Sequence, residues 1–345
     1  MLSPGCCPDA MSKPSDMILP SRVRRAMRAG QLSLHYQPKV ELASGSVVAV
    51  EALARWSHPR RGLIMPSEFV PQVEASRLAG PFNRWVLAQA IEQASTWRRV
   101  GAPVAVAVNL SPACLQDEAL VANVSQLLDL WDLPSDLLWI ELTEGAPWAV
   151  SGRAGETLEQ LVSMGVALAL DDFGVGHSSM SRLVQAPMDV VKVDRSFVTA
   201  MASDPRRSFV VETAIEIAHG LGLRVVAEGV ETRAVWDRLR ELGCDWAQGF
   251  YISRPVAANG VLERVAQLPH TIGTTLRATA AWSGRERRAQ TPENHTVRSM
   301  IDRLDWVSHV EARAPATEVK RIAAVTAGQA RLTLRRGCHR PLLAT

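Results

Sequence analysis

Five apolar, strand-like runs in this chain each end on residues that carry a side-chain oxygen. A carboxylate beside buried apolar strands is costly unless it is paired or binds a cation. Such residues at the end of one strand after another indicate that the strand ends meet at one cation-dependent active site. The runs and their residues are VVAVEAL with Glu51, VAVAVNL with Asn109, LWIELTE with Glu141, VALALDD with Asp171 and Asp172, and RVVAEGV with Glu228.

The spacing of these runs predicts how the strands are connected. LSLHYQP, the first strand, is separated from VVAVEAL only by KVELASGS, which is too short for a crossover helix, so the first two strands should be antiparallel. Strand and helix patterns then alternate to about Leu268, and the later strands are continuously apolar, as in a sheet covered on both faces. We therefore predict the α/β class, a TIM-like (β/α)8 barrel with an antiparallel first strand. A doubly wound open sheet is the alternative, but no G-x-G-x-x-G follows the first strand.

The distribution of charge divides the chain into three parts. Its net charge of +3 is too small to indicate a polyanion-binding protein, although residues 271–345 hold 13 Lys or Arg against 6 Asp or Glu. We predict a disordered N-terminal arm over 1–20, the barrel over 21–268, and a basic tail over 269–345 that is disordered or loosely helical. Nucleic-acid or protein binding by this tail is the sharper alternative, but the tail has no recognisable DNA-binding motif.

Cysteine usage and hydropathy indicate a compartment. The five cysteines are scattered without ligand spacing, which favours reduced thiols in the cytoplasm. The first residues have no apolar core of a signal peptide, and no apolar run approaches the length that crosses a membrane. We therefore expect a cytoplasmic protein with no transmembrane segment and no thiolate zinc site.

The chemistry of the strand-end residues narrows the cation. Carboxylate and amide oxygens suit Mg²⁺ or Mn²⁺. The adjacent carboxylates of Asp171 and Asp172 are placed to flank two cations, which would clamp the attacking and leaving oxygens of a phosphoryl displacement. Each acid taken alone is as readily explained by a helix cap or an ion pair. Repetition at successive strands makes five separate structural roles much harder to accept.

A lysine inside a strand and a glycine-containing loop accompany the acids in the sequence. Lys192 lies inside the apolar strand VVKVD, where its ammonium group would orient an attacking water or stabilise developing charge. An exposed strand end is the alternative for this lysine. The loop after Asp172 contains Gly174 and Gly176, which permit it to move over the site. Glu144 lies just past its strand and is expected to hold that loop rather than bind metal.

These residues carry a family resemblance. Glu51-Ala52-Leu53 with Arg55 resembles the signature of EAL domains, which are phosphodiesterases of the bacterial messenger cyclic di-GMP. The resemblance covers about 23–268 and is highly specific because many motifs occur in order. They are YQP at 36–38, VNLSP at 108–112, ELTE at 141–144, DDFGVGHSS at 171–179, VKVDRSF at 191–197, AEGVET at 227–232 and CDWAQGF with RP at 244–255.

The resemblance implies a role for each matching residue and a reaction. The reaction is hydrolysis of one phosphodiester of cyclic di-GMP to linear pGpG with Mg²⁺ or Mn²⁺, which lowers a messenger that controls biofilm and motility. Ca²⁺ is expected to inhibit, because it prefers longer bonds and higher coordination than a compact two-metal site offers. Lys192 matches the residue that activates the water, with Glu228 and Glu51 as further catalytic groups, and Glu144 matches the loop anchor. The implied metal ligands are Glu51, Asn109, Glu141, Asp171, Asp172 and Glu228. The implied substrate contacts are Arg55, Gln37, Leu53, Asp194, Glu231 and Gln248.

Departures from the family pattern are mild, and two other functions stay open. Val175 and His177 stand where the family more often has Thr and Tyr, and Phe250 stands where Tyr is common. None of these changes removes an implied ligand. One alternative is a catalytically weak cyclic di-GMP receptor or protein scaffold on the same fold. The other is a nucleic-acid-binding regulator that acts through the tail. We expect a homodimer, regulated without a sensory module before the barrel.

Overall fold

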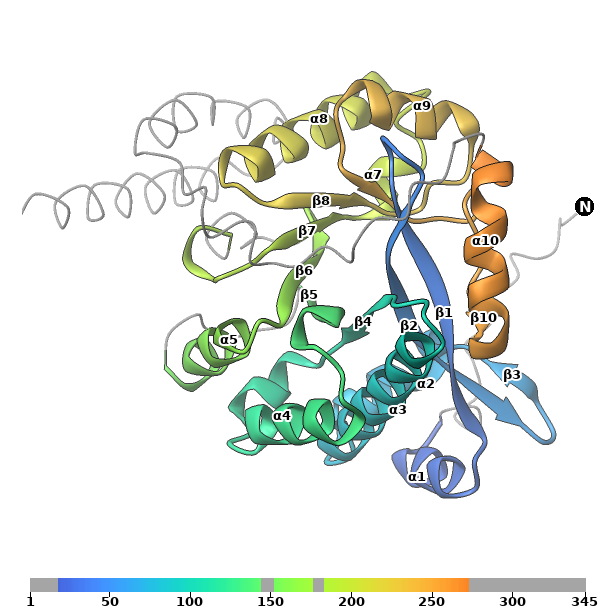
Figure 1. Cartoon of the computed structure of the whole chain (residues 1–345), viewed down its shortest axis with the longest axis vertical. Helices are drawn as coiled ribbons and strands as arrows, with labels where there is room; N and C mark the ends of the chain where they lie inside the picture. The colour runs from blue at the N-terminus through green and yellow to red at the C-terminus, as the bar shows by residue number, and fades with distance from the viewer. Residues whose placement is uncertain (1–17, 144–151, 176–182, 273–345) are drawn as a thin grey trace, which may run out of the picture.

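The computed structural model describes residues 18–143, 152–175 and 183–272 and contains a closed eight-stranded barrel (Figure 1). The sheet closes because β1 pairs with both β2 and β9. Both pairings are antiparallel, whereas all neighbours from β2 round to β9 are parallel. The predicted TIM-like barrel with an antiparallel first strand is confirmed. Its strands are β1 (Leu32–Glu41), β2 (Val47–His58), β4 (Ala105–Asn109), β5 (Leu138–Thr143), β6 (Ala167–Phe173), β7 (Val190–Val193), β8 (Arg224–Ala227) and β9 (Trp246–Ala247).

Helices cover the outside of the strands. In Figure 1, α3, α4 and α5 lie on one side of the barrel, and α8 and α9 lie on the opposite side. The helices are α1 (Pro20–Arg28), α2 (Pro66–Glu74), α3 (Ala79–Arg99), α4 (Leu120–Trp131), α5 (Arg153–Ser163), α7 (Arg195–Val198), α8 (Pro205–Gly220), α9 (Arg233–Glu241) and α10 (Val261–Ile272), with short 3₁₀ helices η2 (Pro112–Gln116), η3 (Ser135–Leu137) and η4 (Ala258–Gly260). None of the helices in these described ranges is both long and apolar enough to cross a membrane.

Several short or terminal elements were not predicted from the sequence, among them β3 (Gly62–Ile64), β10 (Val256–Ala257), α1 and α10. β3 folds back on the end of β2, and β10 pairs with β1. Helices α1 and α10 lie at the two ends of the described part, and α10 runs four residues past the predicted barrel boundary at 268. The predicted arm and tail lie largely outside the described residues, so both stay predictions.

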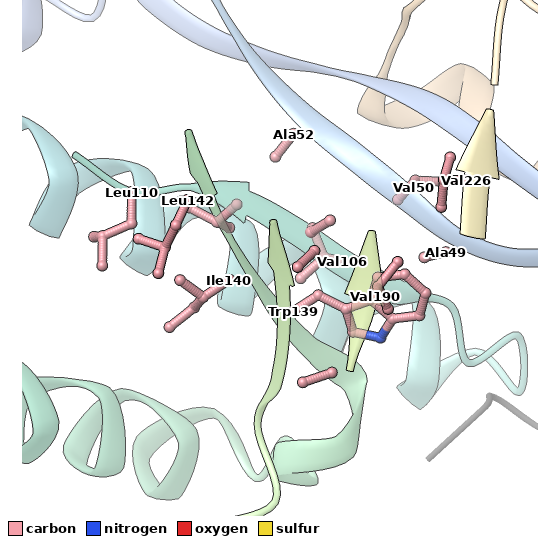
Figure 2. Packing of buried hydrophobic residues seen from close by; sticks show 14 of the residues in the cluster. Ala49, Val50, Ala52, Val106, Leu110, Trp139, Ile140, Leu142, Val190 and Val226 are labelled. Carbon is pink, nitrogen blue, oxygen red and sulfur yellow. The ribbon is translucent and has the colours of Figure 1, made fainter. Parts of the chain in front are cut away.

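Two tryptophans pack against each other inside the barrel, one of them between alanines of the neighbouring strands. Trp139 on β5 is flanked in register by Ala107 on β4 and Ala167 on β6, so its ring has room inside the barrel. Its ring centroid lies 5.2 Å from that of Trp246 on β9. Figure 2 shows Trp139 and its neighbour Ile140 on opposite sides of the strand, as a pleated strand requires. The two rings form an apolar floor below the ends of the strands.

At the end of the barrel where the parallel strands begin, opposite the strand-end acids, Asp245 contacts three groups. Its carboxylate accepts hydrogen bonds from Arg224 at 2.6 Å and from the backbone of Val225 at 2.9 Å, and lies 2.8 Å from the His219 ring. Burial opposes ionisation, but the contacts with His219, Arg224 and Val225 outweigh it and lower the pKa of Asp245. The carboxylate therefore stabilises the fold above its unfolded pKa, and this contribution is lost as the pH falls through the lowered pKa.

We expect Asp245→Asn to reduce the free energy of unfolding at pH 7 by roughly 1–3 kcal/mol, because charged hydrogen bonds are lost. The difference in the free energy of unfolding between Asp245→Asn and the unchanged chain should shrink below about pH 4, where the Asp245 carboxyl of the unfolded chain is protonated. Urea denaturation at pH 7 and at pH 3.5 measures both values. An equal loss at the two pH values would contradict the assignment of this stabilisation to the ionised carboxylate.

Candidate functional site

The polar residues at the strand ends form one network. Glu51 accepts hydrogen bonds from Asn109 and from Gln248, each at 2.6 Å. These three residues come from β2, from β4 and from the segment directly after β9. Gln248 also donates to Gln37 on β1 at 3.1 Å, and Gln37 donates to the backbone oxygen of Ser253 at 3.0 Å. The network therefore links strands on both sides of the barrel closure.

Lys192 lies at the centre of a second group of contacts. Its Nζ atom is 2.7 Å from Glu141 Oε2, 2.9 Å from Asp171 Oδ1 and 2.7 Å from Glu228 Oε1. Only 1% of its side chain is exposed, which excludes the alternative of a lysine on an exposed strand end. The structure thus brings one ammonium group into contact with acids from β5, from β6 and from the segment after β8.

An irregularity in β6 turns two adjacent carboxylates toward the same place. In a regular strand, neighbouring side chains point to opposite faces. Between Leu170 and Phe173 the pairing with β7 shifts register, and Asp172 has a φ of 57°, in the left-handed region. This is a β-bulge, which re-aims side chains, and aspartate tolerates the left-handed conformation better than most residues. As a result Asp171 and Asp172 each place an oxygen in one cluster with Glu228, within 4.8 Å of one another.

The acids around Lys192 differ in their affinity for protons. Burial alone would raise the pKa of Glu51, but Lys192, Lys39 and two hydrogen bonds lower it to about 2. Burial, together with the Asp171 and Glu51 carboxylates, raises the pKa of Glu228 to about 8 even beside Lys192. Burial opposes protonation of Lys192, yet the surrounding carboxylates raise its pKa well above the usual value. The site therefore holds more negative charge than its ammonium groups neutralise.

A divalent cation fits this arrangement. The cluster of Asp171, Asp172 and Glu228 offers oxygen ligands only, as Mg²⁺ and Mn²⁺ prefer. Burial and then the neighbouring carboxylates raise the pKa of Glu228, and a bound cation would favour its ionised form. The buried Oε1 atom of Gln248 has no hydrogen-bond partner, so it is available to accept from a bound water or substrate. The acids thus form a candidate metal site at the strand ends.

Lys39 belongs to the site but was not predicted from the sequence. It is fully buried on β1, and its ammonium group pairs with Oε1 of Glu141, the oxygen that Lys192 does not contact. The signal was present, because Lys39 lies in an apolar strand between Pro38 and Val40, as Lys192 lies between valines. The hairpin spacing did not show that this position faces the interior, since the register of β1 shifts between Lys39 and Val40.

The remaining predicted residues lie around this network, with different surroundings. Arg55 is buried on β2 and donates to the Ala54 backbone oxygen at 2.8 Å, and Leu53 is partly buried. Asp194 follows β7 and accepts from the Ser196 backbone at the start of α7, a structural contact. Glu231 is exposed in the segment after β8. Glu144, the predicted loop anchor, lies outside the described residues, as does most of the glycine-containing loop.

Close backbone packing holds Gln248 in place. A Cβ atom added to Gly249 would lie 2.1 Å from the Val230 backbone oxygen, so the chain can approach this closely only with glycine. Val230 donates to the Gln248 backbone oxygen at 3.0 Å and accepts from Tyr251 at 2.9 Å. The segment that carries Gln248 is therefore fixed against the segment that follows Glu228.

Comparison with known proteins decides the family. The family model of the EAL domain matches residues 21–255. The chain belongs to the EAL domain family. It is 39% identical over 245 residues to the bifunctional diguanylate cyclase/cyclic di-GMP phosphodiesterase MucR of Pseudomonas aeruginosa, covering 71% of this chain and 36% of that protein. It is 36% identical over 241 residues to the cyclic di-GMP phosphodiesterase RocR of the same organism, covering 70% of this chain and 62% of RocR.

Solved structures agree with this membership. The structure of the PaMucR phosphodiesterase in complex with c-di-GMP is similar to the chain with a TM-score of 0.66 and 38% identity, covering 70% of this chain and 98% of that one. The EAL enzyme Bd1971, bound to cAMP and cyclic di-GMP, gives a TM-score of 0.66 at 31% identity, covering 71% of this chain and 68% of that one. The chain spans less than two thirds of the length of the curated relatives MucR and RocR.

Proposed function

We propose that this EAL domain hydrolyses one phosphodiester bond of cyclic di-GMP to give linear 5′-pGpG. The observation that carries the proposal is the contact of Lys192 with Glu141, Asp171 and Glu228, next to the Glu51 network. A receptor needs shape and hydrogen bonds, but it does not need a buried ammonium group among several acids. The relatives MucR and RocR, which are named as cyclic di-GMP phosphodiesterases, support the same substrate.

The acids would hold Mg²⁺ or Mn²⁺ in two positions. A bound cation supplies a more acidic water molecule and neutralises charge on the phosphate. We assign one position to Glu51, Asn109, Glu141 and Asp171, and the other to Asp172 and Glu228. In the described structure Glu51 is oriented by Asn109 and Gln248, so its carboxylate is held in place before any cation arrives.

Lys192 would act as a cation rather than as a base. Its raised pKa keeps the amine protonated at neutral pH, so it cannot accept the proton of the attacking water. Its N–H groups can orient that water and stabilise negative charge that develops on the phosphoryl oxygens. Glu228, which lies 2.7 Å from Lys192, is the carboxylate that we assign to take the proton, once a bound cation has favoured its ionised form.

The residues around the acids would bind the rest of the substrate. Cyclic di-GMP carries two phosphates and two guanine bases, which need cationic groups and amide groups respectively. We assign these contacts to Arg55, Gln37, Leu53, Asp194, Glu231 and Gln248. Of these, Gln248 is the best supported, because its buried Oε1 atom has no partner and lies beside Glu51. Assembly as a homodimer and anchoring of the loop by Glu144 stay predictions.

The experiment is incubation of purified protein with cyclic di-GMP and Mg²⁺ or Mn²⁺, followed by chromatography of the nucleotides. We expect pGpG from the unchanged chain and from Asp245→Asn, and none from Glu51→Ala. Excess Ca²⁺ should suppress turnover, since Ca²⁺ prefers longer bonds and more ligands. Binding of cyclic di-GMP without pGpG at any metal concentration would instead support the receptor alternative.

A further inference from the structure

Helix α1 presents three arginines on the face that points away from its packing partners. Val23 and Ala26 are the buried residues of this helix. At about 100° per residue, Arg24, Arg25 and Arg28 fall on the opposite face, and all three are exposed. The guanidinium groups therefore gather on one side of the helix, toward solvent.

These arginines have no counter-charge on the part of the chain that the structure describes. None of the ion pairs among the described residues involves an arginine of α1. Arg24 and Arg28 are one helical turn apart, a spacing at which like charges repel and weaken a helix. An anionic surface against this face would relieve the repulsion.

Two neighbouring segments extend the positive charge. The first half of α1 borders the segment after α2, where Arg24 and Arg77 line one cleft of about 220 Å³. The residue before β1 accepts a backbone hydrogen bond of 2.9 Å from Ser57, which joins the end of α1 to the hairpin of β2 and β3. The turn of this hairpin carries Arg60 and Arg61. In Figure 1, α1 and the hairpin project together from the lower right of the molecule.

Positive charge is in large excess over this region. Residues 18–31 and 57–78 contain seven arginines against two glutamates, Glu68 and Glu74, and Glu68 is paired with Arg61 at 2.9 Å. The net charge of +3 of the whole chain conceals this local excess. All seven arginines are exposed, and together they are called the arginine face: Arg22, Arg24, Arg25, Arg28, Arg60, Arg61 and Arg77.

Apolar side chains are exposed in the same segments. Leu19, directly before α1, is 47% exposed, Leu63 on β3 is 54% exposed, and Met65, directly after β3, is 42% exposed. A nucleic acid would offer phosphates to the arginines but few contacts to these apolar groups. A bilayer offers both, because anionic headgroups attract basic residues and the headgroup boundary accepts apolar side chains. Clusters of about four to eight basic residues are typical of segments that bind anionic lipid.

We propose that the arginine face docks this domain on the surface of a bilayer that contains anionic lipid. The face belongs to the end of the barrel that holds the acids, because β1 begins beside Trp56, at the end of β2 that follows Glu51. Docking would therefore turn the rim of the site, and not the end that holds Asp245, toward the headgroups. The contact needs no membrane-spanning helix and does not depend on the proposed hydrolysis.

Sedimentation of the full chain with vesicles measures the binding. We expect binding to vesicles of phosphatidylglycerol and phosphatidylcholine in equal parts, much weaker binding to phosphatidylcholine alone, and release by high salt. A chain with Arg24→Gln, Arg25→Gln and Arg28→Gln should bind the anionic vesicles about 10²-fold more weakly, from about fivefold for each arginine at an anionic surface. Leu63→Ser, which changes no charge, should also weaken this binding several-fold.

The matched control removes three exposed arginines from α8 and α9, on the other side of the barrel, by Arg206→Gln, Arg207→Gln and Arg240→Gln. It changes the net charge by the same amount and leaves the basic tail unchanged, so it should keep the affinity of the unchanged chain for the anionic vesicles. Glutamine is a good helix former, and the replaced side chains are exposed, so both triple variants should unfold at the urea concentration of the unchanged chain.

Three results would overturn the proposal. They are equal binding to neutral and anionic vesicles, full affinity of the folded α1 variant, which would assign the binding to another part of the chain, and an equal loss in the control. If the α1 variant did not fold, Arg60→Gln with Arg77→Gln would take its place, with a loss of about 25-fold expected. Binding of a single-stranded oligonucleotide through the α1 arginines, without binding to vesicles, would make the arginine face a nucleic-acid surface instead.

Discussion

Lys192→Met is expected to reduce turnover of cyclic di-GMP by roughly 10²–10³-fold or more, the range for loss of one stabilising group at a reacting centre. Among the residues that the structure describes, Lys192 is the side chain that contacts Glu141, Asp171 and Glu228 together, so none of its described neighbours takes over its contacts. Lys192→Arg keeps the charge but not the compact shape of the ammonium group, and it should recover only part of the activity. Initial rates of pGpG formation at saturating Mg²⁺ measure all three chains.

Lys192→Met should also lower the stability of the cation-free protein, by an amount that depends on pH and on added Mg²⁺. Loss of one partner from a buried ionic cluster costs about 3–5 kcal/mol. With Lys192 gone, the three carboxylates repel one another once ionised, so the deficit should increase with pH. Added Mg²⁺ should restore more stability to Lys192→Met than to the unchanged chain, because the cation replaces a missing counter-charge.

Asp245→Asn provides the control for this result. It weakens a partly exposed cluster at the other end of the barrel and should lower stability without loss of turnover. If Lys192→Met and Asp245→Asn lost the same fraction of turnover when both were destabilised equally, the loss in Lys192→Met would be explained by reduced stability rather than by a role of Lys192 in the reaction. If Lys192→Met kept full turnover, the assignment of Lys192 to the reaction would be wrong.

The barrel was largely predictable because local rules fixed its connections. The short KVELASGS segment forced an antiparallel first pair, and the continuous apolar strands required helices on the outside. β3 and β10 escaped prediction because runs of two or three residues have too little periodicity to be recognised. Helix α1 carries four arginines in nine residues and buries only Val23 and Ala26, so its apolar pattern is too sparse to stand out.

The site was predictable as a set of residue types but not as an electrostatic arrangement. Regular alternation would place Asp171 and Asp172 on opposite faces, and only the bulge with its left-handed Asp172 brings both into one cluster. Lys39 was missed because its partner Glu141 is 102 residues away in the chain. Contacts of this kind depend on strand register across the closed barrel, which local sequence patterns do not encode.

Cation binding is expected to depend steeply on pH because of Glu228. In the cation-free protein the pKa of this carboxyl is raised to about 8, so below pH 8 a proton must leave before the oxygen can ligate. The apparent association constant for Mg²⁺ should therefore rise about tenfold per pH unit between roughly pH 6 and 8, and level off above. Glu51, whose pKa is lowered to about 2, is ionised throughout this range and contributes no slope.

Proton release distinguishes this origin from a general effect of pH on the fold. Calorimetry of Mg²⁺ binding at pH 6.5, in two buffers with different ionisation enthalpies, should show release of about one proton from Glu228, with a further contribution from Glu141, whose pKa is also raised by burial. Glu228→Gln cannot release the Glu228 proton, so its weaker binding should depend less steeply on pH over the same range. Asp245→Asn, which is remote from the acids, should keep the slope of the unchanged chain. A flat affinity between pH 6 and 8 would mean that Lys192 already holds Glu228 ionised, and the negative charge at the strand ends would then be balanced before any cation binds.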